Sequence, residues 1–303
     1  MIEQALYDHL KAQESLAAFL ATYAGGPAVF NQEAPADNDE LWGDGPQYGR
    51  IVYMVDMQGD PERIMGGTLT VDIMCKENLQ FPEEIEPVLR GLIHGWFFSN
   101  GTFTVEAQWK TSRYFTEPTD KVTGCTVAFE LLAFPITSTG SPDVIARINE
   151  WTAAIEGLHV INYDELPAAA WTPSGTDSAI YWRLVSDREA AWIPDTFQTI
   201  WRTSTVRGHI FSATRAIADT VAREIITKLY TDKRLMKEGE SPIMVNRRNT
   251  ADYGANPLRT GQLTVEATYG IIVHLEADPG LINIYFKEEE DDVWHEPQNP
   301  TRP

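Results

Sequence analysis

Two stretches of the chain carry the same order of hydrophobic and polar patterns. Residues 51–98 read as a strand, a polar connection, a second strand and a helix, and residues 180–230 repeat that order. In the second strand of the first copy, residues 68–76, apolar side chains occupy every other position, which is typical of a sheet with one buried face. Repetition of this kind predicts two related units in tandem.

The apolar positions of four segments recur every three to four residues and predict helices. These segments begin at Ile2, Phe81, Pro142 and Ser212, and each offers one apolar stripe to a sheet. Because Pro87 does not suit a helix interior, we expect the regular helix of the second segment to begin only near Glu86.

Consecutive alternating strands favour antiparallel pairing with helices gathered on one face. The predicted fold class is therefore α+β, with two tandem domains, each a mostly antiparallel sheet of about four strands covered by two helices. The segment Phe134–Pro142 is the expected linker because it is rich in Ser, Thr, Gly and Pro. We expect domains at residues 1–136 and 142–287, and an acidic C-terminal tail at residues 288–303.

Composition narrows the classes of partner. The chain has 303 residues, of which 43% are apolar, enough to fill hydrophobic cores. Its net charge of -20 disfavours binding to the phosphates of DNA. No secretory signal and no run long enough to cross a membrane is expected. Cys75 and Cys125 fall on inward positions, which predicts buried free thiols and fits a reducing cytoplasm.

The sequence offers no complete catalytic, metal or cofactor motif. None of the six histidines stands at zinc-ligand spacing, and phosphate-binding glycine loops are absent. The acidic stretch Asp37–Glu40 resembles a calcium loop, but Trp42 stands where the turn glycine belongs. We expect no cofactor, no metal and no enzymatic activity from local sequence.

Several tryptophans lie in expected loops or in the tail, away from the apolar stripes. Because aromatic residues are enriched at protein interfaces, they indicate contacts with other proteins, although packing onto their own domain is an open alternative. The candidates for such contacts are Trp42, Trp192 and Trp294.

The first half combines a set of short features: the opening helix Met1–Ala12, Tyr53 in a strand, Gly59–Arg63, the strand Leu69–Met74, and Tyr114–Asp120 before a last strand. In this combination the first half resembles the tail terminator, or tail completion, proteins of long-tailed bacteriophages. The resemblance covers about the first 135 residues, the length of one ordinary domain, and the second half matches only in outline.

This resemblance implies a virion protein, assembled in the host cytoplasm, that forms a homo-oligomeric ring at the head-proximal end of the tail. Its expected partners are other copies of itself, the tail tube protein and the head-tail connector proteins, while DNA passes through without specific binding. Two domains per chain allow a trimer with pseudo-sixfold symmetry or a hexamer. We expect the contacts in two loops, one with Gln58, Asp60, Glu62 and Arg63, and one with Arg113, Glu117, Asp120 and Lys121.

Two other classes of function stay open. Another ring-forming component of a tail, connector or baseplate would share the acidity and the repeated fold. A cytoplasmic hydrolase with a non-local active site would use scattered residues, for instance Asp56 or Asp72 near His94.

Overall fold

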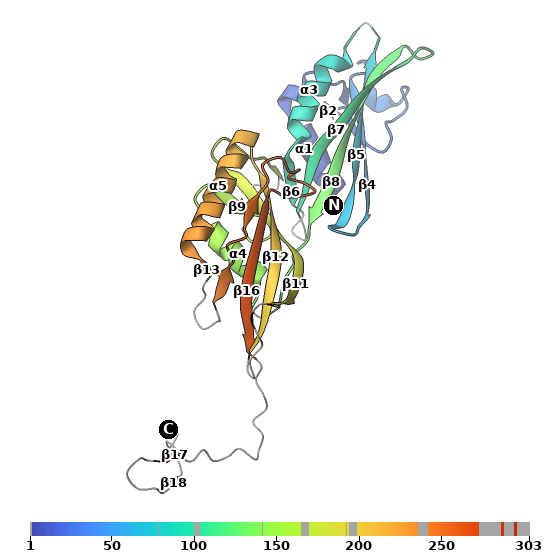
Figure 1. Ribbon diagram of the computed structural model, residues 1–303. Helices are drawn as coiled ribbons and strands as arrows, with labels where there is room; N and C mark the ends of the chain where they lie inside the picture. The colour runs from blue at the N-terminus through green and yellow to red at the C-terminus, as the bar shows by residue number, and fades with distance from the viewer. Residues whose placement is uncertain are drawn as a thin grey trace, which may run out of the picture.

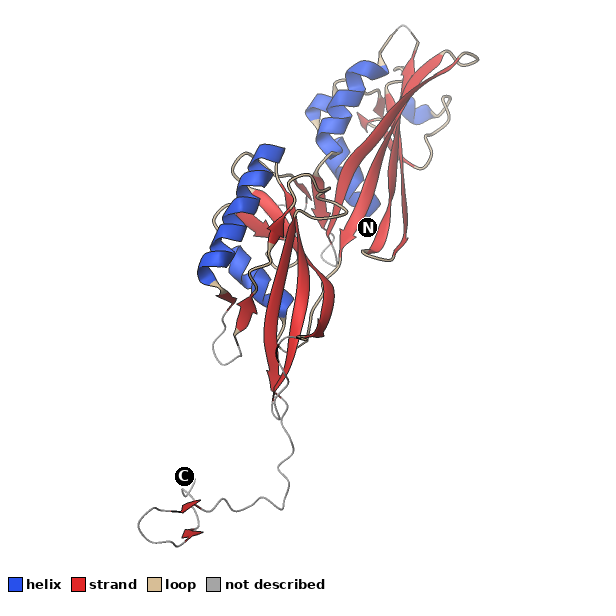
Figure 2. Ribbon diagram, viewed as in Figure 1, coloured by secondary structure: helices blue, strands red, loops and turns tan. Residues whose placement is uncertain are grey.

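The protein consists mainly of two curled sheets that lie end to end, each with its longer helices on one face (Figure 1; Figure 2). A computed structural model describes residues 2–77, 79–99, 104–140, 142–164, 170–191, 193, 199–235, 242–272, 286–287 and 294–295. Of these residues, 43% are in strands and 23% in helices. Residues up to 134 form the first half, and residues from 144 to 272 form the second half.

The first half contains a sheet whose strands follow the order β6-β7-β8-β5-β4-β3. The strand β10, which comes from the second half, extends this sheet beyond β6. The elements are α1 (Ile2–Lys11), α2 (Glu14–Ala17), β1 (Thr22–Tyr23), β2 (Gly26–Pro27), β3 (Val29–Asn31), η1 (Glu40–Trp42), β4 (Arg50–Asp60), β5 (Ile64–Lys76), α3 (Pro82–Ile93), β6 (Trp96–Ser99), β7 (Thr104–Glu117) and β8 (Val122–Phe134).

The second half contains a sheet with the order β13-β14-β16-β12-β11-β9, and β15 pairs with β16 beside that row. Its elements are α4 (Val144–Ala153), β9 (Leu158–Val160), β10 (Ala170–Trp171), β11 (Ser178–Glu189), β12 (Thr199–Phe211), α5 (Arg215–Asp232), β13 (Arg234–Leu235), β14 (Ile243–Val245), β15 (Thr250–Ala251) and β16 (Leu263–Ile272). Two further short strands, β17 (Phe286–Lys287) and β18 (Trp294–His295), pair with each other.

The two sheets have the same topology. Read from one edge to the other, the six strands of each row correspond one to one, and the helix α3 after β5 corresponds to α5 after β12. In both sheets the edge strand, β3 or β9, is parallel to its neighbour, while the other neighbouring strands are antiparallel. The repeat in the hydrophobic pattern thus corresponds to a repeat in strand order.

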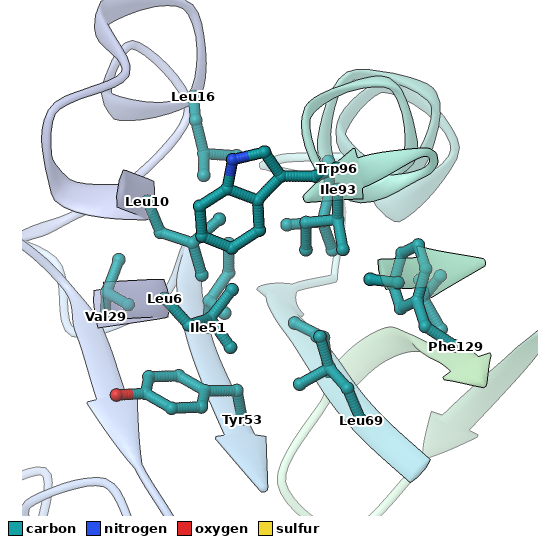
Figure 3. Close-up of a cluster of buried hydrophobic side chains, with 14 of the residues drawn as sticks. Leu6, Leu10, Leu16, Val29, Ile51, Tyr53, Leu69, Ile93, Trp96 and Phe129 are labelled. Atoms are coloured by element: carbon teal, nitrogen blue, oxygen red, sulfur yellow. The ribbon is translucent and has the colours of Figure 1, made fainter. Parts of the chain in front are cut away.

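The core of the first half lies between its helices and the facing side of its sheet (Figure 3). Helix α1 buries Leu6 and Leu10 against Val29 and Ile51 of the β3–β4 edge, and α3 buries Ile93 on the opposite side. Each fully buried aliphatic side chain of this kind stabilises the fold by about 1.5–3 kcal/mol.

The predicted fold class is wrong. The chain is mostly β, and each half contributes six strands to a half-barrel sheet rather than about four strands beneath two helices. The error comes from short edge strands. Residues 96–98 were assigned to the preceding helix, but Gly95 adopts a left-handed backbone (φ 73°) that reverses the chain, so that Trp96 begins β6. Strand β3 has only three residues, too few for an alternating pattern to indicate a strand.

Two smaller predictions have clear outcomes. Helix α3 begins at Pro82 rather than near Glu86, with Pro87 inside the helix on its exposed face and Ile85 and Leu89 on the buried face. The prediction for Cys75 and Cys125 is confirmed, since both are free and fully buried. The expected acidic tail, residues 288–303, lies outside the described residues apart from β18.

Candidate functional site

The two halves meet at the turn of the β4–β5 hairpin. The carboxylate of Asp60 accepts hydrogen bonds from the backbone N–H groups of Glu62 and Arg63, each at 2.9 Å, and this closes the turn. Ile64 follows with a left-handed backbone (φ 65°) and starts β5. This local geometry directs the side chain of Arg63 away from solvent and into the second half, where it is fully buried.

Arg63 is surrounded by groups from both halves. Its Nη2 donates a hydrogen bond to the backbone carbonyl of Leu258, and its guanidinium lies 5.3 Å from the ring centre of Phe134 and 5.1 Å from that of Tyr181. Its Nε and Nη1 have no hydrogen-bond partner among the described residues. Burial lowers the pKa of Arg63 to about 10, which leaves the side chain charged at neutral pH.

His209 is buried beside Arg63 and is neutral. Its Nδ1 lies 2.7 Å from the carbonyl oxygen of Pro257 and 3.2 Å from Nη2 of Arg63, and the shorter contact to an acceptor assigns the proton to Nδ1. Burial, and secondarily the charge of Arg63, lowers the pKa of His209 to about 3. The neutral imidazole therefore adds no second positive charge beside the arginine.

Glu106 is the third ionisable group at this junction. It comes from β7, its side chain is almost completely buried, and its Oε2 has no hydrogen-bond partner among the described residues. Burial raises the pKa of Glu106 to about 8, although the charge of Arg63 acts in the opposite direction. The carboxyl group is therefore mainly protonated at neutral pH.

An apolar cluster joins the halves around these polar groups. Phe97, Leu132 and Phe134 from the first half pack against residues of the second half. Those residues are Ile161, Ala179, Tyr181, Phe211 and Leu258. The main chain also crosses the boundary, because β10 pairs with β6 in antiparallel register. The halves therefore share a core of their own and a continuous sheet edge.

Ion pairs surround this shared core. Arg259 lies 3.0 Å from Asp60 and also pairs with Glu130, while Arg183 lies 3.5 Å from Glu62. Burial raises the pKa of Asp60, but the hydrogen bonds from Arg259 and the turn amides outweigh it and hold the pKa below its usual value. Cations of the second half thus meet carboxylates of the first.

A cleft of about 700 Å³ opens beside the shared core. The first half lines it with His94, Glu106 and Gln108, and the second half lines it with the start of α5, including Arg215 and Asp219. Burial lowers the pKa of His94, which keeps the imidazole neutral. Within the described residues, no group of His, Cys, Asp and Glu side chains could hold a metal ion.

The two predicted contact loops lie at opposite ends of the first half. Gln58, Asp60, Glu62 and Arg63 belong to the hairpin that meets the second half. The other loop forms the far end of the β7–β8 hairpin, where Lys121 accepts a hydrogen bond from the amide of Glu77. All four of its candidate residues, Arg113, Glu117, Asp120 and Lys121, are exposed.

The predicted loop tryptophans have different positions. Trp42 is buried against Tyr23 and Phe30, and its Nε1 donates to the carbonyl of Ala36, so it anchors the loop of its own half. Trp192 lies outside the described residues, and Trp294 lies in β18.

The hydrolase grouping is not assembled around the cleft. His94 lines the cleft, whereas Asp56 and Asp72 do not, and Asp72 accepts a hydrogen bond from Thr126 Oγ1 at 2.5 Å. Sequence reasoning missed Glu106 and His209, because each lies in a strand whose outer face is covered only after the halves meet. Comparison with known protein families, curated proteins and solved structures found no match.

Proposed function

We propose that the chain is a structural virion protein that forms a ring at the head-proximal end of a long-tailed phage tail. In this proposal the ring ends the tail tube and joins it to the head connector, and the two halves are the tandem domains expected at residues 1–136 and 142–287. The single observation that supports the proposal most is that one chain holds two copies of one topology, joined end to end.

The joint relates different surfaces of the two copies. Strand β5 begins at the junction and ends at the opposite end of its half, while the equivalent β12 ends at the junction with Phe211. The end that begins β5 in one copy therefore contacts the end that finishes β12 in the other. Interfaces between two different surfaces generate closed rings when the rotation closes, and filaments when it does not. Three chains would supply six copies, and six chains would supply twelve.

The charge of the chain is compatible with a ring around DNA. A net charge of -20 disfavours adhesion of DNA phosphates to the protein, so an acidic lining would let the DNA slide. In the described part of the chain, no helix is both long and apolar enough to cross a membrane.

Electron microscopy of the full chain mixed with isolated tail tubes tests the proposal. The expected result is a ring at one end of each tube, and tubes whose length no longer increases when tube protein is added. Rings that bind a baseplate or connector preparation instead of tube ends would favour another ring-forming component. A chain that stays a single particle and leaves tube growth unchanged would contradict both.

A second candidate, an enzyme that acts in the cleft, is favoured by Glu106 alone. A buried carboxyl group that stays protonated at neutral pH can donate a proton to a leaving group. The test is hydrolysis of a panel of ester, glycoside and phosphate substrates by the wild type and by Glu106→Gln. Turnover that the substitution abolishes would support this candidate, and equal or absent turnover would exclude it.

A further inference from the structure

We propose that the outer end of the first half binds the outer end of the second half of another copy of the chain. The outer end of the first half comprises Leu79–Phe81 and the turn Pro118–Lys121, and that of the second half comprises the start of β12 and the end of β16. This inference rests on the proposed self-assembly and specifies the surfaces that carry it.

The internal repeat identifies the first of these surfaces. At the junction, the second half presents two connections to the first half: the one between β12 and α5, and the one between β14 and β16. They supply Leu258, which packs against apolar side chains of the first half, and Arg259, which donates a hydrogen bond to Asp60 of the first half. The first half has the same end, with the equivalent connections between β5 and α3 and between β7 and β8. No other part of the described chain packs there as the first half packs on the second.

The uncovered end carries large apolar side chains. Leu79 is 73% exposed and Phe81 is 53% exposed, within one short connection, and Tyr114 of β7 is 48% exposed. Scattered apolar residues are ordinary on a surface, but a group at one end of a fold marks a contact site. The two ends of the β4–β5–β8–β7 strands thus differ: apolar side chains are buried at the junction, whereas Leu79 and Phe81 are exposed at the other end.

A second copy of the chain is the occupant that the repeat specifies. The first half uses the start of β5 to contact the second half, and the equivalent start of β12 lies at the end of the second half that is away from the junction. There Ile200 is 37% exposed and pairs in register with Ile271 of β16. Exposed apolar side chains therefore lie next to the end of β5 in the first half and at the start of β12 in the second half. Joining these ends repeats, between chains, the end-to-end arrangement already present within one chain.

Cross-linking of single-cysteine variants tests the polarity of the contact. Phe81→Cys and Ile200→Cys are made separately in the full chain, where the native thiols of Cys75 and Cys125 are buried and unreactive. With a short bis-maleimide, the expected result is a cross-linked dimer in the mixture of the two variants and none with either variant alone. A dimer formed by Phe81→Cys alone would indicate a symmetric contact and overturn the proposal, as would the absence of a dimer in the mixture.

Charge substitutions measure the strength of the same contact. The double substitution Leu79→Glu and Phe81→Glu should weaken self-association at least about tenfold, because two exposed apolar side chains lose their burial in the contact. Ile136→Glu is the matched control, since Ile136 is 77% exposed but lies in the connection between the halves. Equal weakening by the control, or no weakening by the double variant, would overturn the proposal.

The outcomes separate this inference from the proposed function. Rings that form without the mixed cross-link keep the ring proposal and remove this contact. A mixed cross-link in open filaments keeps the contact and removes the ring. Cross-linking of Phe81→Cys only to the tube protein would assign this end to a different partner and overturn the proposal.

Discussion

Removing the ionisable group of Glu106 should change how stability depends on pH. The folded protein holds this carboxyl group with a pKa of about 8, against an ordinary value of 4.5, because burial penalises the charged form. A pKa that folding raises means that the folded state binds the proton more tightly than the unfolded state. The resulting stability is fully present below about pH 4.5 and is lost as the pH rises towards 8.

The size of the effect follows from the difference between the two pKa values. Each pKa unit corresponds to about 1.4 kcal/mol. Between pH 4.5 and pH 7 the contribution of Glu106 to the free energy of unfolding should therefore fall by about 3 kcal/mol. Glu106→Gln carries no proton to lose. Its unpaired amide costs stability at every pH, so the two proteins must be compared by slope and not by absolute stability.

Urea denaturation of the full chain at a series of pH values is the assay. The difference in free energy of unfolding, Glu106→Gln minus wild type, should rise by about 3 kcal/mol from pH 4.5 to pH 7. Measurements at pH 4.5 are the internal control, since in the folded proteins both side chains are then neutral. A difference that stays constant across this range would refute the reasoning, because it would mean that Glu106 ionises freely in the folded protein.

Three other predictions concern separate parts of the molecule. Gly91→Ala in the last turn of α3, where an added Cβ meets nothing, should stabilise the protein by about 0.5 kcal/mol. Gly67→Ala should destabilise it by more than about 2 kcal/mol because its Cβ would overlap the backbone of β4, and thermal denaturation compares the two variants. Because the pKa of His209 is lowered to about 3, its contribution to the free energy of unfolding is present above about pH 6.5 and is lost as the pH falls. The loss should reach about 2 kcal/mol at pH 5. The variant His209→Asn should lack this part of the acid sensitivity, which urea denaturation measures. Burial raises the pKa of both Cys75 and Cys125 to about 11, so a thiol reagent at pH 8 should label the unfolded chain and leave the native chain unlabelled; rapid labelling of the native chain would contradict the buried position of these strands.

The sequence could predict the parts of the fold that depend on local periodicity. Alternating apolar positions indicated the strand pair that begins at Ile51, and the order of strands and helices indicated the repeat. The number of strands could not be predicted in this way, because a short edge strand such as β6 pairs along its length with a distant strand, and its pattern does not differ from the end of a helix. The reversal at Gly95 depends on one backbone angle.

The candidate site depends on contacts between residues far apart in the chain, which local patterns do not encode. Arg63 was predicted in a loop that contacts other proteins, and the contact that the structure shows is with the second half of the same chain. Glu106 alternates with the apolar residues Val105 and Ala107 along β7, a pattern that favours a solvent-facing position for the polar side chain. It is buried only because the second half covers that face.

The mass of the purified full chain in solution, measured by native mass spectrometry, tests the central claim most directly. If repeated folds joined end to end build a closed ring, the mass should be three or six times the 34.0 kDa of one chain and should not increase with concentration. A particle of 34.0 kDa at every concentration, or a series of masses without an end, would contradict the account.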